Sequence, residues 1–357
     1  MKREYFKQTF WLFACFVLSV SFTGCSSWTD TESMKINEPN IQNQNSKLYA
    51  QYLTKLRAYK ASNHKIVIGW FDNSNKLPIN QAQHISALPD SLDYVSLMTP
   101  DTLTQSELNE IADVRKDKAT KFIFTIDFDA IKLIYDNREK DFDAQKAKAE
   151  AEGKTFTLTY PDFNSFLIDS VKTTLKLVDK YHYDGINVAY NGKLKLYMSN
   201  EDKVTYTGYE NDFLGIALDW HSRHTDKILF YQGKPQNMID QSILSDCKYI
   251  MLPCTDAVSS AGLVYTTNSA CVQGVPTDKF IPIVQTTSLD NSDVKTGYWS
   301  NSVHAISGAA TWVAEEHNGF SIIGIGIYNI GNDYYHPAWT YNYVRTAITT
   351  INPSIKK

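Results

Sequence analysis

The stretch from Tyr183 to Asn191 combines the pattern of a buried strand with polar side chains at regular spacing. It is rich in β-branched and aromatic residues, and Gly192 follows it. Because side chains alternate along a strand, Asn187, Ala189 and Asn191 share one face. A small and polar face on a buried strand is typical of the inside of a parallel barrel near its mouth, the end where the strands finish. Amide side chains there can hydrogen-bond a ligand, but they have no proton to give as an acid.

Acidic and aromatic residues also stand where other strand-like runs end. Asp127 and Asp129 follow one such run on a shared face and are the best-placed acids of the chain. Alternatively, they belong to a hydrogen-bonded loop that caps the next helix. Trp70 closes the first run, where it could form the floor of a sugar site or belong to the core. Three more candidates lie near the ends of later runs: Tyr231, Gln285 and Tyr328.

The central stretch resembles the signature strand of family-18 glycoside hydrolases, the chitinases and endo-β-N-acetylglucosaminidases. That signature is Asp-Gly-x-Asp-x-Asp-x-Glu on the fourth strand of a (β/α)8 barrel. Asp184 and Gly185 match its first two positions, and its other acidic positions fall on Asn187, Ala189 and Asn191. In the family the final Glu protonates the glycosidic oxygen, and the preceding Asp holds the substrate's 2-acetamido group during its attack on the anomeric carbon. The resemblance therefore implies a barrel with a degenerate motif and no catalytic residue.

Composition is compatible with glycan binding. Aromatic residues make up 13% of the chain, including 22 Tyr and 7 Trp, and sugar C–H faces stack on aromatic rings, although large barrels also use aromatics in their cores. The resemblance points to chains containing N-acetylglucosamine, such as N-glycans or chitin-like oligosaccharides. The residues expected to bind the glycan are Trp70, Asp127, Asp129, Asn187, Tyr190, Asn191, Tyr231, Gln285 and Tyr328.

Strand-like apolar runs alternate with helical patterns along the chain, as in parallel α/β folds. Eight strands are predicted, at 65–70, 94–98, 121–126, 183–191, 227–231, 249–252, 280–285 and 320–328, with Pro282 an awkward interior residue. Helices are predicted at 46–59, 81–88, after a capping box at 104–107, and at 137–154, 162–181, 212–221 and 338–350. We expect a single (β/α)8 TIM barrel over residues 47–357, without a second domain.

Residues 1–24 have the features of an export signal, because basic residues precede an apolar core too short for an ordinary membrane span. The end of this segment, residues 22–25, resembles a bacterial lipobox with cleavage before Cys25 and lipid on its thiol; an ordinary secretory signal is the alternative. Residues 25–46 are polar and are predicted to form a flexible tether. Asp30 and Glu32, close behind Cys25, resemble the acidic export signals of surface lipoproteins in glycan-foraging Gram-negative bacteria. This resemblance implies an outer-membrane lipoprotein exposed at the cell surface.

Charge and the remaining reactive residues exclude several classes of function. A formal net charge of −4 and a pI near 6.1 disfavour a nucleic-acid partner. Cys247, Cys254 and Cys271 match no zinc template, and either one disulfide or buried thiols remain open. His221 and His224 lack a third ligand nearby and are expected at the surface. No metal and no cofactor are expected.

Two classes of function remain in competition. The first is a non-catalytic, membrane-anchored glycan-binding protein; the second is a working glycosidase whose acid has moved to Asp127, Asp129 or Asp256. A weaker third is a lipoprotein that only scaffolds a glycan-uptake complex. The lack of carboxylates on the central strand favours binding. The expected partners are an oligosaccharide or glycoprotein glycan, the membrane through the lipid anchor, and other glycan-uptake proteins.

Overall fold

The computed structural model describes residues 44–353. The predicted signal, Cys25 and nearly all of the predicted tether therefore lie outside the described residues. The chain divides into two compact units, Met1–Gln51 and Tyr52–Lys357, and the second contains the barrel. Helix α3 (Ser46–Ala61) runs across the boundary between them. Within the described range, no helix combines the length and the apolar character needed to cross a lipid bilayer.

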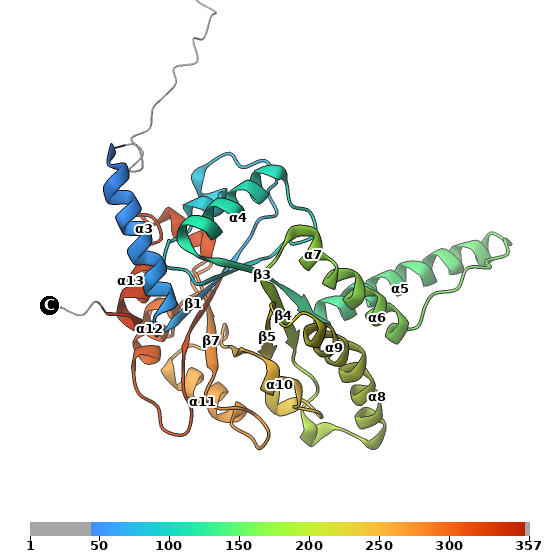
Figure 1. Cartoon of the computed structure of the whole chain (residues 1–357). Helices are drawn as coiled ribbons and strands as arrows, with labels where there is room; N and C mark the ends of the chain where they lie inside the picture. The colour runs from blue at the N-terminus through green and yellow to red at the C-terminus, as the bar shows by residue number, and fades with distance from the viewer. Residues whose placement is uncertain (1–43, 354–357) are drawn as a thin grey trace, which may run out of the picture. The chain divides into compact units, whose positions relative to one another are not determined.

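Eight parallel strands pair in chain order and close into a barrel, with β8 against β1 (Figure 1). The strands are β1 (Ile66–Phe71), β2 (Tyr94–Leu97), β3 (Lys121–Asp127), β4 (Gly185–Tyr190), β5 (Ile228–Gly233), β6 (Tyr249–Pro253), β7 (Phe280–Gln285) and β8 (Gly324–Tyr328). Their near-continuous apolar runs are typical of strands covered on both faces. The predicted (β/α)8 fold is confirmed, and the polar-faced stretch forms its fourth strand.

Helices follow most strands and cover the outside of the barrel (Figure 1). They are α4 (Gln105–Lys118), α5 (Phe128–Ala151), α6 (Phe163–Leu175), α7 (Leu177–Tyr181), α8 (Asn200–Glu210), α9 (Ile216–Arg223), α10 (Ile243–Asp246), α11 (Ser260–Ala270), α12 (Ala305–Ala314) and α13 (Asn342–Ile351). The predicted capping box begins α4: Thr104 Oγ1 accepts from the Glu107 amide, and the Glu107 carboxylate accepts from the Thr104 amide.

One of the predicted helices was wrong, and a second is helical as predicted but starts within a π-helical turn. The segment 81–88 makes two short 3-10 turns, Gln81–Gln83 and Ile85–Ala87, because His84 between them is extended. The segment 212–221 begins inside a π-helical turn, Asn211–Gly215, that joins α8 to α9. Strand β8 starts at Gly324, later than expected. Pro282 does lie inside β7, opposite Leu252 of β6.

The alternation of strand side chains divides the core into two layers. The inner layer fills the barrel and contains Ile68, Trp70, Tyr94, Ile123, Phe230, Met251, Ile281 and Ile283. The outer layer lies between strands and helices and includes Ile186, Val188 and Tyr190 of β4. On β4 this leaves Asn187 and Ala189 facing the barrel interior, as the period of two predicts.

Candidate functional site

A row of polar side chains crosses the barrel interior at the level of Asn187. The Asn187 side-chain amide donates to Thr125 Oγ1 at 3.0 Å and to Gln232 Oε1 at 2.7 Å. Thr125 Oγ1 also lies 3.4 Å from Trp70 Nε1 and 3.4 Å from Ser96 Oγ. The row thus links residues of β1, β2, β3, β4 and β5 beneath the mouth.

Asn187 carries an unused acceptor at the centre of this row. Its side chain is fully buried, and within residues 44–353 its Oδ1 has no hydrogen-bond partner. A buried carbonyl without a partner is destabilising unless water or a ligand donates to it. The site therefore presents a ready acceptor for an N–H or O–H group that enters the barrel.

The two motif positions nearest the mouth make different contacts. Ala189 offers only a methyl group and lies opposite Asp127 in the register of β4 with β3. Asn191 donates from Nδ2 to Asp129 Oδ2 at 2.8 Å, so its amide is already held by a carboxylate. The position at which a proton donor would be expected therefore holds an amide bound to an acceptor.

Asp127 is the N-cap of α5, as the alternative interpretation from the sequence held. Its Oδ1 accepts from the amide of Ala130 at 3.1 Å. Burial raises the pKa of the Asp127 carboxyl, and the nearby negative charge of Asp129 raises it further. Asp129 itself is exposed in the first turn of α5. Asp127 is therefore a half-buried carboxyl at the mouth that holds its proton to a higher pH than an ordinary aspartate.

Aromatic rings from β1 and β8 lie side by side near the mouth. The ring centroids of Trp70 and Tyr328 are 6.0 Å apart, with the planes tilted by 38°. Trp70 is only 2% exposed, whereas Tyr328 is half-buried. A Cβ at Gly326 would lie 3.0 Å from the Trp70 ring, so the glycine makes room for the indole. Burial raises the pKa of the Tyr328 phenol, and the charges of Asp127 and Asp72 add to this, which keeps it a neutral donor.

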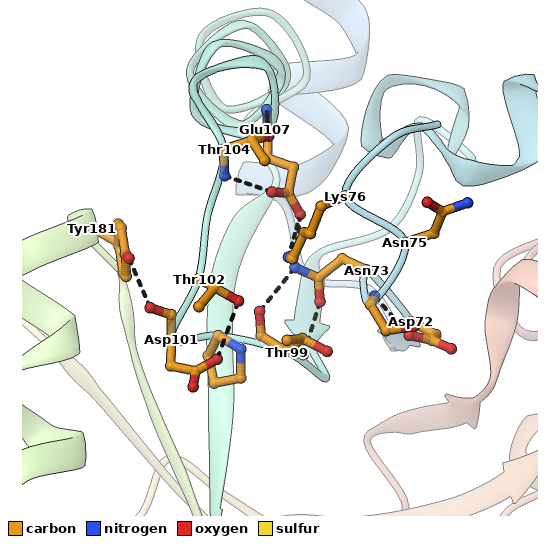
Figure 2. Close-up of polar contacts among 12 residues, drawn as sticks. Asp72, Asn73, Asn75, Lys76, Thr99, Asp101, Thr102, Thr104, Glu107 and Tyr181 are labelled. Atoms are coloured by element: carbon orange, nitrogen blue, oxygen red, sulfur yellow. Dashed lines mark hydrogen bonds and ion pairs between the residues drawn. The ribbon is translucent and has the colours of Figure 1, made fainter. Parts of the chain in front are cut away.

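A second polar network fixes the loop that follows β1. Figure 2 shows Glu107 of α4 accepting from Asn73 Nδ2 and from Lys76 Nζ, each at 2.9 Å. Asn73 also exchanges two hydrogen bonds with the backbone of Thr99, after β2. Burial acts to raise the pKa of Glu107, but hydrogen bonds from Lys76, Thr104 and Asn73 outweigh it and hold the pKa below its usual range. The network ties the loops after β1 and β2 together beside the mouth.

Two of the tyrosines selected from the sequence lie away from the barrel interior. Tyr190 and Tyr231 are 1% and 0% exposed in the helical layer, where Tyr231 Oη donates to the Tyr190 carbonyl at 2.7 Å. Each is one residue away from an inward-facing side chain on its strand and therefore points outward. The prediction that Tyr231 lies at the mouth was wrong. Gln285 does end β7 and is half-buried, with Nε2 3.5 Å from the carbonyl of Thr255. Asp256 is exposed after β6.

Asp184 lies at the opposite end of β4 from the mouth. Its Oδ2 accepts from Arg115 at 2.9 Å and from the amide of Phe122 at 2.8 Å. The first position of the motif thus stabilises the junction of β3, β4 and α4. It does not reach the polar row around Asn187.

The sequence analysis missed three members of the polar row: Ser96, Thr125 and Gln232. Gln232 is inward because β5 extends to Gly233, two residues beyond its predicted end. Because side chains alternate along a strand, counting two residues on from the inward-facing Phe230 would have placed Gln232 inward. Within the described part of the chain, the three cysteines are free thiols and no group of three or more His, Cys, Asp or Glu is placed to hold a metal ion.

Comparison with solved structures shows the same fold in other proteins. A Glu-to-Gln variant of BT1044 in selenomethionine form matches at a TM-score of 0.59 and 17% identity, covering 88% of this chain and 96% of that one. The endo-β-N-acetylglucosaminidase of Cordyceps militaris matches at 0.55 and 16%, covering 85% and 96%. A double mutant of that enzyme in complex with fucosyl-N-acetylglucosamine-Asn matches at 0.55 and 17%, covering 84% and 95%.

The sequence itself matches a defined family, although no curated protein matches it. The match, to the family described as glycoside hydrolase family 18, BT1044-like, extends over residues 29–350. It includes the strand with the degenerate motif and all eight strands of the barrel. The chain therefore belongs to glycoside hydrolase family 18, in the BT1044-like group.

Proposed function

We propose that the protein is a non-catalytic glycan-binding protein, tethered to the outer membrane and specific for glycans that contain N-acetylglucosamine. The observation that carries the proposal concerns the acidic positions of the family motif. They hold Asn187 and Ala189 on the inner face of β4 and Asn191 directly after the strand. The barrel and its mouth are kept, and the carboxylates of that strand are replaced.

The contacts of these residues argue against hydrolysis by the family's route. That route needs a proton donor at the glycosidic oxygen and a carboxylate that orients the acetamide. Asn191 cannot protonate a leaving group, and its amide is already bound to Asp129. Ala189 places a methyl where the orienting group would lie. Losing a general acid alone lowers the rate by about 10²–10⁴-fold.

The same mouth retains groups that suit glycan binding. Asn187 Oδ1 is a buried acceptor that has no partner in the described structure and could receive an acetamide N–H. Tyr328 provides an aromatic face and a neutral hydroxyl, and Asp127 a carboxylate acceptor. The complex of the fungal enzyme with fucosyl-N-acetylglucosamine-Asn supports the choice of ligand class.

The test is a glycan array with the soluble chain from Ser26 onward, followed by calorimetry on the best ligand and a hydrolysis assay on the same ligand. We expect binding without release of sugar. Asn187→Leu should abolish binding, because the isosteric apolar side chain removes both the acceptor and the donor. Asn268→Leu on α11 is the matched control and should leave binding unchanged. Absence of any bound glycan would contradict the proposal.

The anchor is a separate part of this proposal and rests on Cys25, outside the described residues. Intact cells should incorporate a labelled fatty acid into the protein, and Cys25→Ala should release it from the membrane fraction. Protease treatment of whole cells should then degrade the wild-type protein if it faces the outside. Equal retention of Cys25→Ala in membranes would contradict the lipid anchor.

One observation favours the alternative function, a glycosidase whose catalytic acid lies at a different position from that of the family motif. Asp127 is half-buried at the mouth with a raised pKa, as a general acid requires. Hydrolysis by the unmodified protein that is lost in Asp127→Asn, and kept in Asp256→Asn, would establish this alternative in place of pure binding.

A further inference from the structure

A large cavity opens at the end of the barrel opposite the mouth. Its volume is about 710 Å³. Its walls include Ile66, Tyr94, Lys121 and Tyr249, which are the first residues of β1, β2, β3 and β6. These positions place it at the amino ends of the strands, so it is separate from the proposed glycan site at their carboxyl ends.

The charges that line this cavity are strongly unbalanced. Four lysines contribute to its wall: Lys60, Lys65, Lys121 and Lys248. The one carboxylate in the lining is Asp93. Both of its oxygens are used, since Oδ1 contacts His64 Nε2 at 2.9 Å and Oδ2 accepts from the amide of Val67 at 2.9 Å.

The hydrogen bonds that the lysines make are to neutral oxygens. Lys60 donates to Thr120 Oγ1 and the Leu92 carbonyl, Lys65 to the Ile322 carbonyl, and Lys248 to Tyr94 Oη. In residues 44–353 none of the four lysines forms an ion pair. An ammonium group has three donors, so each of the four keeps at least one for a ligand.

Partial burial and neighbouring positive charge both disfavour the protonated forms of these lysines. Burial lowers the pKa of Lys60 to about 8, against opposing effects of Asp93 and Asp90. Burial also lowers the pKa of Lys248, and the charge of Lys121 lowers it further. A bound anion would relieve this repulsion and restore the charged forms.

We propose that this cavity binds a multiply charged oxyanion of the phosphate or sulfate class. Four lysines that line one cavity favour a ligand with at least two negative charges over a single carboxylate. The volume exceeds what a bare phosphate fills, which leaves room for an organic part beside Tyr94 and Tyr249. Their rings lie 6.2 Å apart in an edge-on arrangement, with Lys248 over both.

The test is titration calorimetry of the soluble chain from Ser26 onward at low ionic strength, with pyrophosphate and glucose 6-phosphate as probes and glucose as the uncharged comparison. Both anions should bind with an affinity that falls as sodium chloride is added, and glucose should not bind. Vesicles that contain phosphatidic acid test a lipid headgroup as the source of the phosphate. Binding to the vesicles alone would assign the site to a membrane surface, and binding to soluble probes alone to a free ester.

Two variants remove single charges from the cavity. Lys121→Met is at an exposed position and should fold normally, and Lys248→Met removes the ammonium nearest the tyrosines. Each should weaken pyrophosphate binding about tenfold, the typical worth of one charged hydrogen bond. Lys203→Met, at an exposed position on α8, is the matched control and should bind as the wild type does.

Three results would overturn the proposal: no binding of pyrophosphate, glucose 6-phosphate or the vesicles, equal weakening by Lys203→Met, or unchanged affinity in Lys121→Met. Because the proposed glycan site lies at the other end of the barrel, none of these results would bear on glycan binding.

Discussion

Asp127 of β3 and Ala189 of β4 are partners in the parallel register, one strand apart at the same height in the barrel. Paired residues of neighbouring strands project to the same face, so the Asp127 carboxyl begins beside the methyl group of Ala189. The family motif has a carboxylate at the position of Ala189. In this chain the nearest carboxylate at that height belongs to the adjacent strand, where it also caps α5 through the amide of Ala130.

We expect Asp127→Asn to weaken glycan binding about tenfold, because an amide oxygen accepts a hydrogen bond less strongly than a carboxylate does. The helix cap should survive, since Asn is as good an N-cap as Asp. In the wild type, binding should weaken as the pH falls through the pKa of Asp127, which lies above 3.8. The variant should lose this pH dependence. Calorimetry between pH 4 and pH 7 measures both, and an identical pH profile in the variant would contradict the role of Asp127.

Catalysis should not return when one motif position is restored. In Asn191→Glu a proton donor is present, but Ala189 still leaves the acetamide unheld, and Asp129 lies beside the new carboxyl. We expect no turnover from the single change and a trace from the double change with Ala189→Asp. Release of sugar from chito-oligosaccharides and N-glycoproteins measures this. Full activity in the single variant would show that Asp127 can already orient the substrate.

Trp70 belongs to the inner core and is also an expected glycan-binding residue. Two substitutions of different size are therefore needed to separate its effect on folding from its effect on binding. Trp70→Ala should weaken glycan binding, and it should also destabilise the fold by about 3–5 kcal/mol, because the indole is 2% exposed. Trp70→Phe keeps an aromatic ring but loses the contact from Nε1 to Thr125 and the ring atoms that pack beside Gly326. Binding by Trp70→Phe close to that of the wild type would assign the effect to stacking. Denaturation curves of both variants separate folding from binding.

Glu107 should stabilise the loops beside the mouth. Glu107→Ala leaves Lys76 and Asn73 without their shared acceptor and should cost about 3 kcal/mol of unfolding free energy. Asp113→Ala, at an exposed position of the same helix, is the control and should change little. The pKa of Glu107 is lowered in the folded state, so its contribution is present above the unfolded value near 4.5 and is lost as the pH falls through the folded value. Urea unfolding at pH 7 and pH 3.5 should show the difference between Glu107→Ala and wild type narrowing at the lower pH.

The barrel could be predicted from the sequence because strands covered on both faces read as apolar runs, and the motif-like stretch is the fourth of eight. The inward direction of Asn187 followed from the period of two. The end of β5 did not follow, and that two-residue error placed Tyr231 at the mouth where Gln232 lies. The pairing of Asp127 with Ala189 depends on the register between strands, which no pattern within one strand contains. The lysine-lined cavity joins residues from six separate segments, and their spacing along the chain gives no signal.

Lys60 should make the stability of the protein rise with pH in the alkaline range. Its pKa is about 8 in the folded state and 10.5 as a free side chain, chiefly because burial disfavours the charge. Below pH 8 both states are protonated and the folded state carries the full cost of the buried ammonium. Between pH 8 and pH 10.5 the folded state has lost the proton that the unfolded state still binds, so the unfolding free energy contributed by Lys60 increases with pH.

Lys60→Met removes that titration while keeping a long apolar stem. The unfolding free energy of the wild type relative to Lys60→Met should therefore be higher at pH 9.5 than at pH 7. Taking this difference cancels the raised pKa values of buried tyrosines, which are the same in both proteins. Urea unfolding at the two pH values measures it. Saturating pyrophosphate should reduce the effect, because an anion in the cavity favours protonated Lys60 in the folded state. A difference that is equal at both pH values would show that Lys60 titrates as it does in the unfolded chain.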